Sequence, residues 1–389
     1  EAGRFAPGLR VVGWHGPNRR VEDLYDADLV VTSYALLRRD PALTDRVWSW
    51  AVLDEAQQIK NPASQVARAA RRLQALHRLA LTGTPLENDL IELWSLFSFL
   101  MPGLLGRRSR FHARYSRSGR LGGGPSLDEL FHRLRPFVLR RRKVDVAPEL
   151  PPRTELTVRV TLSDGEARLY ERVRATVRAA LTDGLPDGGP PPASVVLDGL
   201  TRLRQACCHP GLLPFPEART VQRSAKLEAL VEQVGAAIAA GSRCLVFSQW
   251  VKLLDHVADA LGAVGVGFLR LQGDTVDRGA VVAAFQAPDG PPALLVSLKA
   301  GGTGLNLTAA DVVFLLDPWW NPAVEDQAAD RAHRIGQTRP VTVVRLVAAD
   351  TIEDRVLALQ DRKRKLFDDT VDRGGIPPLT AVEWEALLA

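Results

Sequence analysis

Short apolar runs recur along this chain, and each ends in a cluster of polar or glycine residues. The runs lie at residues 29–31, 51–53, 79–81, 244–247, 294–296 and 312–316. Continuous rather than alternating apolar runs are typical of strands buried on both faces, as in parallel sheets. Helical spacing of apolar residues lies between them, for example at Leu227, Leu230, Val231, Val234 and Ile238. The alternation predicts an α/β fold with parallel sheets flanked by helices, in which ligands bind beyond the carboxyl ends of the strands.

The length of 389 residues favours two or three domains. Glycine and proline clusters at 122–125 and 187–192 are typical of loops or flexible connectors, and helical patterns lie around 164–181 and 194–208. We therefore predict a first lobe at 1–110, a helical connector at 111–225, a second lobe at 226–350, and a charged brace helix with a tail at 351–389.

The composition is that of an ordinary globular protein, with 46% hydrophobic and 24% charged residues. No apolar run approaches the ~20 residues needed to cross a bilayer, so we expect no membrane segment. The chain starts at Glu1 with no signal segment after it, which favours a fragment of a longer, non-secreted protein. Three cysteines indicate a reducing compartment, and the adjacent pair Cys207-Cys208 before His209 makes a poor zinc site.

The net charge of +5 is compatible with a polyanionic partner but does not prove one. Of the 50 basic residues 43 are arginine, which suggests a GC-rich coding sequence and hence a bacterium. We expect a cytoplasmic, nucleoid-associated protein.

Two acidic residues, Asp54 and Glu55, follow the run at 51–53. Such a pair can hold Mg²⁺ through water with one carboxylate and orient an attacking water with the other, as phosphoryl transfer requires. Alone, the pair is more often the start of a solvated loop or a charge at a helix N-terminus. Thr82 and Thr84 end the next strand on a proline-containing turn, where their hydroxyls could hydrogen-bond the acid pair.

The later part of the chain carries a stronger signal. Residues 297–306 place three glycines and several hydroxyl or amide side chains beyond a strand, which suits close approach by phosphates. In the following segment at 317–337, helical spacing would put Gln327, Asp330, Arg331 and Arg334 on one face. Two guanidinium groups on that face could stabilise a transferring phosphoryl group, although an exposed salt-bridged helix has the same pattern.

The order of segments 54–57, 81–88, 297–306 and 317–337 resembles motifs II, III, V and VI of the Swi/Snf ATPases. Segments 31–34, 137–143 and 203–210 support the resemblance. These ATPases are helicase-like motors of superfamily two that translocate on double-stranded DNA. The resemblance implies two RecA-like lobes, the first truncated at its N-terminus, joined by a mostly helical connector, with ATP and Mg²⁺ bound between the lobes.

The resemblance also implies roles for individual residues. The catalytic set is Asp54, which holds Mg²⁺ through water, Glu55, and the arginine fingers Arg331 and Arg334. The nucleotide-site set is Gln327, Asp330, Gly302 and Gly304, and the coupling set is Thr82, Thr84 and Gln57. The set expected to face DNA is Thr32, Ser33, Ser248, Gln249, Thr303, Asn306 and Trp319. The basic runs 140–143 and 362–365 are further candidates for DNA contact, or else solvated charged faces.

The chain departs from the family pattern in one serious respect, because it contains no Gly-Lys-Ser or Gly-Lys-Thr sequence. That loop cradles the β- and γ-phosphates in this family. We expect that it was lost with upstream chain, that the intact protein is an ATPase, that this fragment alone is inactive, and that strands of the first lobe lack a pairing partner. Arg278 follows Gly273 too closely to be given a nucleotide role.

The leading hypothesis is a double-stranded-DNA translocase that acts on DNA or on a protein–DNA complex. An RNA-directed helicase and a non-catalytic DNA-binding scaffold are the alternatives. Strand separation is not assumed, and the biological pathway stays open.

Overall fold

The computed structural model describes residues 2–83, 90–115, 127–141, 143–182, 193–221, 223–301 and 304–361. The chain divides into two compact units, with a boundary between Leu139 and Arg140. Residues up to Leu139 pack around their own hydrophobic cores, and residues from Arg140 around others. The domain boundaries expected from the sequence at 110 and 225 stay predictions.

The first unit contains two parallel strand pairs. β1 (Val11–Trp14) pairs with β2 (Leu29–Thr32), and β3 (Val47–Leu53) pairs with β4 (Gln74–Ala80). Among the described residues these are two separate two-stranded sheets, so each strand has a single partner; the loss of a neighbouring strand stays a prediction. The helices and helical turns around them are α1 (Ala2–Phe5), η1 (Val21–Leu24), α2 (Tyr34–Arg39), α3 (Pro41–Thr44), η2 (Ala56–Ile59) and α4 (Gln65–Arg72).

Burial of β3 differs from the expectation of two covered faces. Ala51 and Leu53 point into the core of the first unit, together with Ile59 and Phe99. On the other face, Trp50 is 59% exposed and Val52 is 53% exposed. The continuous apolar run thus marked the strand correctly, but only one of its faces is covered.

A small helical cluster completes the first unit. It consists of α5 (Leu90–Leu100), α6 (Arg108–Tyr115), α8 (Leu127–Leu134) and the turn η3 (Arg135–Phe137). Phe97, Phe111 and Leu130 form its core. Through α5 the cluster contacts both β4 and η2, so it packs beside the strand end that carries Asp54.

The second unit is built on a six-stranded sheet in the order β5-β10-β9-β6-β8-β7, with every neighbouring pair parallel. The strands are β5 (Arg153–Val160), β6 (Cys244–Ser248), β7 (Phe268–Leu271), β8 (Ala293–Ser297), β9 (Val312–Leu315) and β10 (Val341–Ala348). Every residue of β6 and β8 is buried, which is why their sequences are continuously apolar.

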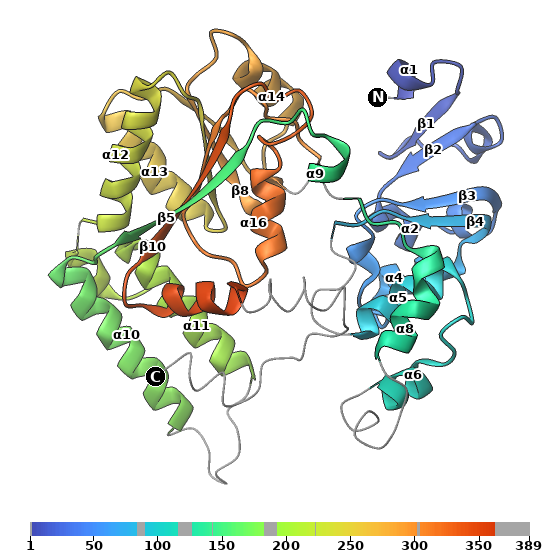
Figure 1. Ribbon diagram of the computed structural model, residues 1–389, viewed down its shortest axis with the longest axis horizontal. Coiled ribbons are helices and arrows are strands. Elements are labelled where there is room, and N and C mark those ends of the chain that lie inside the picture. Colours follow the sequence, from blue (N-terminus) through green and yellow to red (C-terminus); the bar gives the residue numbers. More distant parts are fainter. Residues whose placement is uncertain are drawn as a thin grey trace. The chain divides into compact units, whose positions relative to one another are not determined.

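Helices cover both faces of this sheet, as Figure 1 shows. On one face, α12 (Ala225–Ala239) and α13 (Val251–Ala263) pack on Cys244 and Val246 of β6. On the other face, α14 (Arg278–Gln286) and α16 (Pro322–Ala329) pack on Leu245 and Phe247. The predicted fold class, a parallel α/β sheet flanked by helices, is confirmed.

The segment expected to be a connector contributes an edge strand to this sheet, because β5 pairs with β10 along its whole length. The helices expected in that segment are present as α10 (Asp164–Thr182) and α11 (Ala193–Cys208). They pack on Ile352 and Val356 of the C-terminal helix, whose described part is 352–361. The remaining short elements are α9 (Lys143–Val146), η4 (Pro210–Leu212), η5 (Pro216–Thr220) and α15 (Leu298–Gly301).

Candidate functional site

The acid pair lies where β3 ends. The Asp54 side chain is exposed, and its Oδ1 accepts a hydrogen bond from the Glu55 backbone N–H at 2.9 Å. Glu55 has φ +49°, in the left-handed region that a residue other than glycine rarely occupies. Holding it there costs on the order of 1–3 kcal/mol, and such costs cluster at functional sites. The backbone N–H of Ala56 bonds to the carbonyl of Leu81, so the turn after β3 is fixed to the end of β4.

Two of the three residues predicted to couple the acid pair to the next strand are connected to it. The Thr82 hydroxyl donates to Gln57 Oε1 at 2.7 Å, and Gln57 Nε2 donates to Glu55 Oε2 at 2.6 Å. A continuous line of side-chain hydrogen bonds therefore runs from Thr82 to Glu55. Thr84 lies outside the described residues.

Tyr34 was not predicted as a site residue, yet its hydroxyl donates to the backbone carbonyl of Asp54 at 2.7 Å. Burial, together with the charges of Asp54 and Glu55, raises the pKa of the Tyr34 hydroxyl, so it stays protonated and able to donate. The neighbouring Ser33 caps α2 by accepting from the Leu36 N–H, and the exposed Thr32 donates to the carbonyl of Trp14. The segment 31–34 thus lies beside the acid pair, with Thr32 and Ser33 near the surface.

In the second unit, residues predicted to face DNA gather where β6 and β9 end. Asp317 accepts from the backbone N–H of Gln249 at 3.2 Å, which ties the two strand ends together. Ser248 is buried and accepts from the Trp250 N–H, whereas Gln249 and Trp319 are partly exposed. The last two side chains are therefore better placed than Ser248 for a direct contact with a ligand.

Arg204 of α11 organises these strand ends and was missed by the sequence analysis. Its NH2 donates to the carbonyl of Pro318 at 2.6 Å, and its guanidinium lies 3.9 Å from Asp317. The same group lies over the rings of Trp319 and Trp320, at 5.3 and 5.5 Å from the ring centroids. Cation–π contact and the nearby carboxylate compensate for burying this charge.

Two buried groups near these strand ends have pKa values shifted in opposite directions. Burial raises the pKa of Asp317 from 3.8 to about 6, although Arg204 opposes the shift. Burial, followed by the nearby His256, lowers the pKa of His209 from 6.5 to about 4. The rings of His209 and His256 are stacked with centroids 3.9 Å apart.

These shifts predict how stability depends on pH. Between about pH 4 and about pH 6 the folded state holds more protons at Asp317 than the unfolded state, so this group lowers the free energy of unfolding as pH rises. His209 holds fewer protons when folded, so it acts in the opposite sense. Asp317→Asn should therefore make the free energy of unfolding rise more steeply with pH in this window, by up to ~1.4 kcal/mol per pH unit.

The measurement is urea unfolding of the parent chain and the variant at closely spaced pH values across that window. His209→Gln provides the matched comparison, because it should change the slope in the opposite direction. Equal slopes in the parent and in Asp317→Asn would show that Asp317 does not titrate as described.

The second unit also brings the glycine-rich segment and the arginines together. The backbone N–H of Leu307 bonds to the carbonyl of Arg331, and Arg334 NH1 donates to the carbonyls of Gly304 and Leu305 at 3.2 and 3.3 Å. Gly304 has φ +52°. Asn306 is exposed beside it, whereas Gly302 and Thr303 lie outside the described residues.

One helix face does not carry the four polar residues as predicted, because α16 ends at Ala329. Gln327 lies on the helix, Asp330 is its C-cap, and residues 330–337, here called the arginine turn, follow it. Arg331 is 5% exposed, whereas Arg334 is exposed. Gln337 stabilises the turn by donating to the carbonyls of Ala310 and Ala332. The spacing of the four polar residues predicts a longer helix, but α16 ends at Ala329 and long-range hydrogen bonds such as that from Gln337 to Ala310 hold the following residues in a turn.

The described residues cover only part of the two basic runs. Arg142 and the whole run 362–365 lie outside the described residues. Lys143 is paired with Asp330 at 2.6 Å, so its charge is directed at the arginine turn.

The described ranges contain no group of three or more histidine, cysteine or acidic residues that could hold a metal ion. The exposed Asp54 carboxylate nevertheless fits Mg²⁺, which keeps most of its waters and binds through one or two carboxylates together with substrate phosphates. No helix in the described part of the chain is long and apolar enough to span a bilayer.

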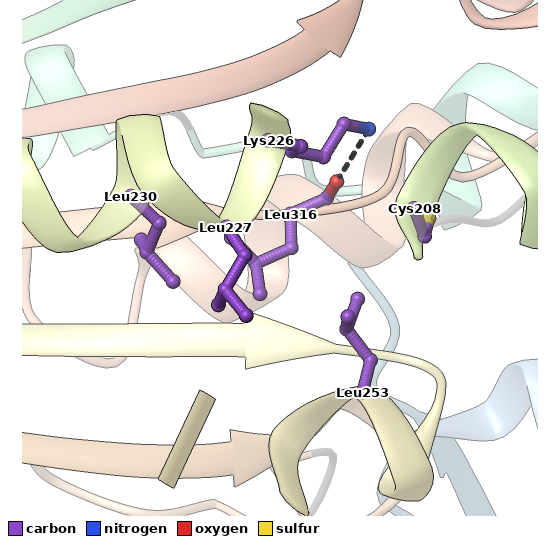
Figure 2. Close-up of a pocket in the computed structure, with 6 residues that line it drawn as sticks. All are labelled: Cys208, Lys226, Leu227, Leu230, Leu253 and Leu316. Carbon is purple, nitrogen blue, oxygen red and sulfur yellow. Dashed lines mark hydrogen bonds between the residues drawn. The ribbon is translucent and has the colours of Figure 1, made fainter. Parts of the chain in front are cut away.

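A pocket beside β9 is lined by Cys208, Leu227, Leu230, Leu253 and Leu316, with Lys226 at its edge (Figure 2). Lys226 Nζ donates to the carbonyl of Leu316 at 3.1 Å, the contact drawn in Figure 2. The pocket leaves no space for a water molecule and touches none of the predicted site residues. It is a packing gap beside a buried lysine.

Comparison with known families places the chain. A profile of the SNF2-related domain matches residues 1–212, and a profile of the helicase conserved C-terminal domain matches residues 225–336. The chain belongs to the SNF2-related family. The resemblance inferred from motifs II, III, V and VI is thereby confirmed.

Relatives of this SNF2-related chain include the putative ATP-dependent helicase/translocase YwqA of Bacillus subtilis, 38% identical over all of this chain and 43% of its own length. The human SWI/SNF-related matrix-associated actin-dependent regulator of chromatin subfamily A member 1 is 35% identical over 96% of this chain and 37% of its own. The solved structure of the Sulfolobus solfataricus SWI2/SNF2 ATPase core in complex with dsDNA is 34% identical over 95% of this chain and 78% of its own, with a TM-score of 0.48. The chain thus spans less than half the length of these curated relatives.

Proposed function

We propose that this SNF2-related chain is the ATPase core of a translocase that moves along double-stranded DNA. The observation that carries the proposal is the line of hydrogen bonds from Thr82 through Gln57 to Glu55. It connects the acid pair to the end of the neighbouring strand, so a change at either end can be sensed at the other. A solvated loop has no need of such a connection, nor of a strained glutamate.

The chemistry proposed is hydrolysis of ATP. Mg²⁺, when bound, would neutralise charge on the phosphates, and Asp54 would hold it through water. Glu55 orients the attacking water and accepts its proton. Gln57 fixes the Glu55 carboxylate by donating a hydrogen bond from Nε2 to Glu55 Oε2. Arg331 and Arg334 stabilise the charge that develops on the transferring phosphoryl group. Gln327, Asp330 and the glycines Gly302 and Gly304 support the nucleotide.

The DNA contacts proposed are to the phosphate backbone. Thr32 and Ser33 in the first unit, and Gln249, Asn306 and Trp319 in the second, lie at or near the surface. Ser248 acts indirectly through the strand end that it stabilises, and Thr303, three positions before Asn306 in the sequence, is the remaining proposed contact. Because backbone contacts carry no sequence information, affinity should fall steeply with salt and vary little with sequence.

The phosphate-binding loop of the family has no counterpart in this sequence, and the chain spans less than half the length of its curated relatives, so two forms of the protein are needed for the test. One is the chain of 389 residues, and the other is the same chain extended by its upstream coding sequence. We expect phosphate release by the extended form to be stimulated more by double-stranded DNA than by single-stranded DNA or RNA, and the shorter form to be inactive.

Each other outcome of this assay points to a different function. Preferential stimulation by RNA would favour an RNA-directed helicase. DNA binding by the extended form without phosphate release would favour a non-catalytic scaffold. A displacement assay with a protein–DNA complex then tests whether such a complex is the target. The names of two relatives, a chromatin regulator and a TATA-binding protein-associated factor, motivate this assay.

A further inference from the structure

A lysine at the start of the second unit contacts the arginine turn at two points. Lys143 Nζ lies 2.6 Å from Asp330 Oδ1 and donates to the backbone carbonyl of His333 at 2.9 Å. One contact is made with a side chain and the other with the backbone, on either side of Arg331. Lys143 therefore holds the backbone of the turn in place, in addition to neutralising the charge of Asp330.

Neighbouring residues of the same segment extend this contact. Arg153 NH1 lies 3.6 Å from Asp330 Oδ1, and its NH2 lies 2.8 Å from Asp326 of α16. The His333 ring nitrogen Nε2 lies 2.8 Å from the carbonyl oxygen of Pro151. Segment 143–153 thus contacts the helix end and the turn at several points, all of them far away in sequence.

The other side of the arginine turn is held by different groups. Arg334 NH1 bonds to the carbonyl of Gly304, and Gln337 Nε2 bonds to the carbonyl of Ala310. These contacts place the turn on the glycine-rich segment. Segment 143–153 holds the same turn through a second set of contacts. The position of Arg331 and Arg334 therefore depends on both sets.

We propose that Lys143 is a positioning residue for Arg331 and Arg334. The proposal rests on the function proposed above, because the arginines need a defined position only if they act on a phosphoryl group. Lys143 follows the boundary at Leu139 and Arg140 by a few residues.

The exposure of the pair determines what kind of effect to expect. The Lys143 side chain is 42% exposed and that of Asp330 is 37% exposed, so solvent screens their attraction. Such a pair adds little to the stability of a whole domain. Its loss should loosen the turn locally and leave the sheet intact.

The first experiment measures hydrogen exchange in the chain of 389 residues and needs no ATPase activity. A peptide covering 330–337 reports the amides of His333 and Gln337, which bond within this region. In Lys143→Met, exchange of that peptide should be about fivefold faster than in the parent, near the upper limit for an exposed ion pair. Lys252→Met, a matched change at an exposed lysine of α13, should leave it unchanged. Equal exchange in parent and Lys143→Met would overturn the proposal.

The second experiment measures kinetics and DNA affinity in the extended form. Lys143→Met should lower kcat on the order of tenfold with little change in KM for ATP, because a displaced catalytic group acts on the chemical step. Lys143→Arg keeps the charge and should restore most of kcat. If Lys143→Met instead weakens duplex binding and lowers the salt slope by about one, Lys143 is a DNA contact and the proposal is wrong.

The two experiments separate the two hypotheses. A parent protein that hydrolyses no ATP would refute the proposed function. In that case, faster exchange of 330–337 in Lys143→Met would still show that Lys143 restrains the turn. Only the catalytic role assigned to that restraint would be refuted.

Discussion

Glu55→Gln should lower DNA-stimulated phosphate release by the extended protein by about 10²- to 10⁴-fold, the range typical of a lost general base. The amide has almost the same shape as the carboxylate, so it can still accept the hydrogen bond that Gln57 Nε2 now donates to Glu55 Oε2. It cannot take a proton from water. The line from Thr82 to position 55 therefore survives in the variant while the chemistry does not.

The measurement is steady-state phosphate release at saturating ATP and duplex DNA, with duplex affinity measured in parallel. Glu22→Gln, at an exposed glutamate of η1, is the matched control and should keep the parent rate. Affinity for DNA should be nearly the same in all three proteins, because Glu55 carries no phosphate contact. Phosphate release by Glu55→Gln within a few-fold of the parent would remove Glu55 from the catalytic role.

Much of the second unit could be predicted from sequence because its strands are buried on both faces. The runs at β6 and β8 are continuously apolar because every residue of these strands is buried. The polar residues that end the runs lie at the carboxyl edge of the sheet. The same reasoning placed Thr82 near the acid pair, since β3 and β4 are parallel neighbours. In these places local sequence and global fold agree.

Prediction failed where a distant partner decides the local structure. The spacing of Gln327, Asp330, Arg331 and Arg334 fits a helix, but Gln337 and Arg334 bond to residues 304–310 and hold the chain in a turn. Lys143 was taken as part of a basic run because its partner lies far along the chain. Arg204 likewise gains its role from Pro318 and Trp319, which no local pattern around residue 204 reveals.

β5 is a different case, because its signal was present in the sequence. Leu156, Val158 and Val160 alternate with polar residues, the pattern of a strand with one buried face. Because this pattern is not a continuous apolar run, β5 was not among the predicted strands. Edge strands of a parallel sheet are covered less completely than central ones, so both kinds of pattern belong to the same sheet.

The largest effect on stability is expected at the ion pair between Lys226 of α12 and Glu353 of the C-terminal helix. Lys226 Nζ lies 2.5 Å from Glu353 Oε2, and the two side chains are 2% and 1% exposed. Burial alone would lower the pKa of Lys226, but the charge of Glu353 outweighs it and the pKa is raised, so the lysine stays charged. Glu353 also accepts from the backbone N–H of Ala348, which joins this helix to β10.

Lys226→Met should therefore lower the free energy of unfolding of the second unit by ~3–5 kcal/mol, because it leaves the Glu353 carboxylate buried without its cation. Leu316, whose carbonyl accepts from Lys226 in Figure 2, would lose its donor as well. Urea unfolding followed by circular dichroism measures the change. Lys252→Met, the same replacement at an exposed lysine, should stay within ~0.5 kcal/mol of the parent.

The double variant Lys226→Met with Glu353→Gln tests whether the uncompensated charge is the cause. Glutamine keeps an acceptor for the Ala348 N–H and removes the buried charge. If charge dominates, the double variant should be more stable than Lys226→Met alone, although it carries one more substitution. If the lost hydrogen bonds dominate, the second substitution should add to the loss, because methionine fills nearly the same space as the lysine stem. A double variant less stable than Lys226→Met would thus assign the effect to the hydrogen bond that Lys226 donates to the Leu316 carbonyl rather than to an uncompensated charge.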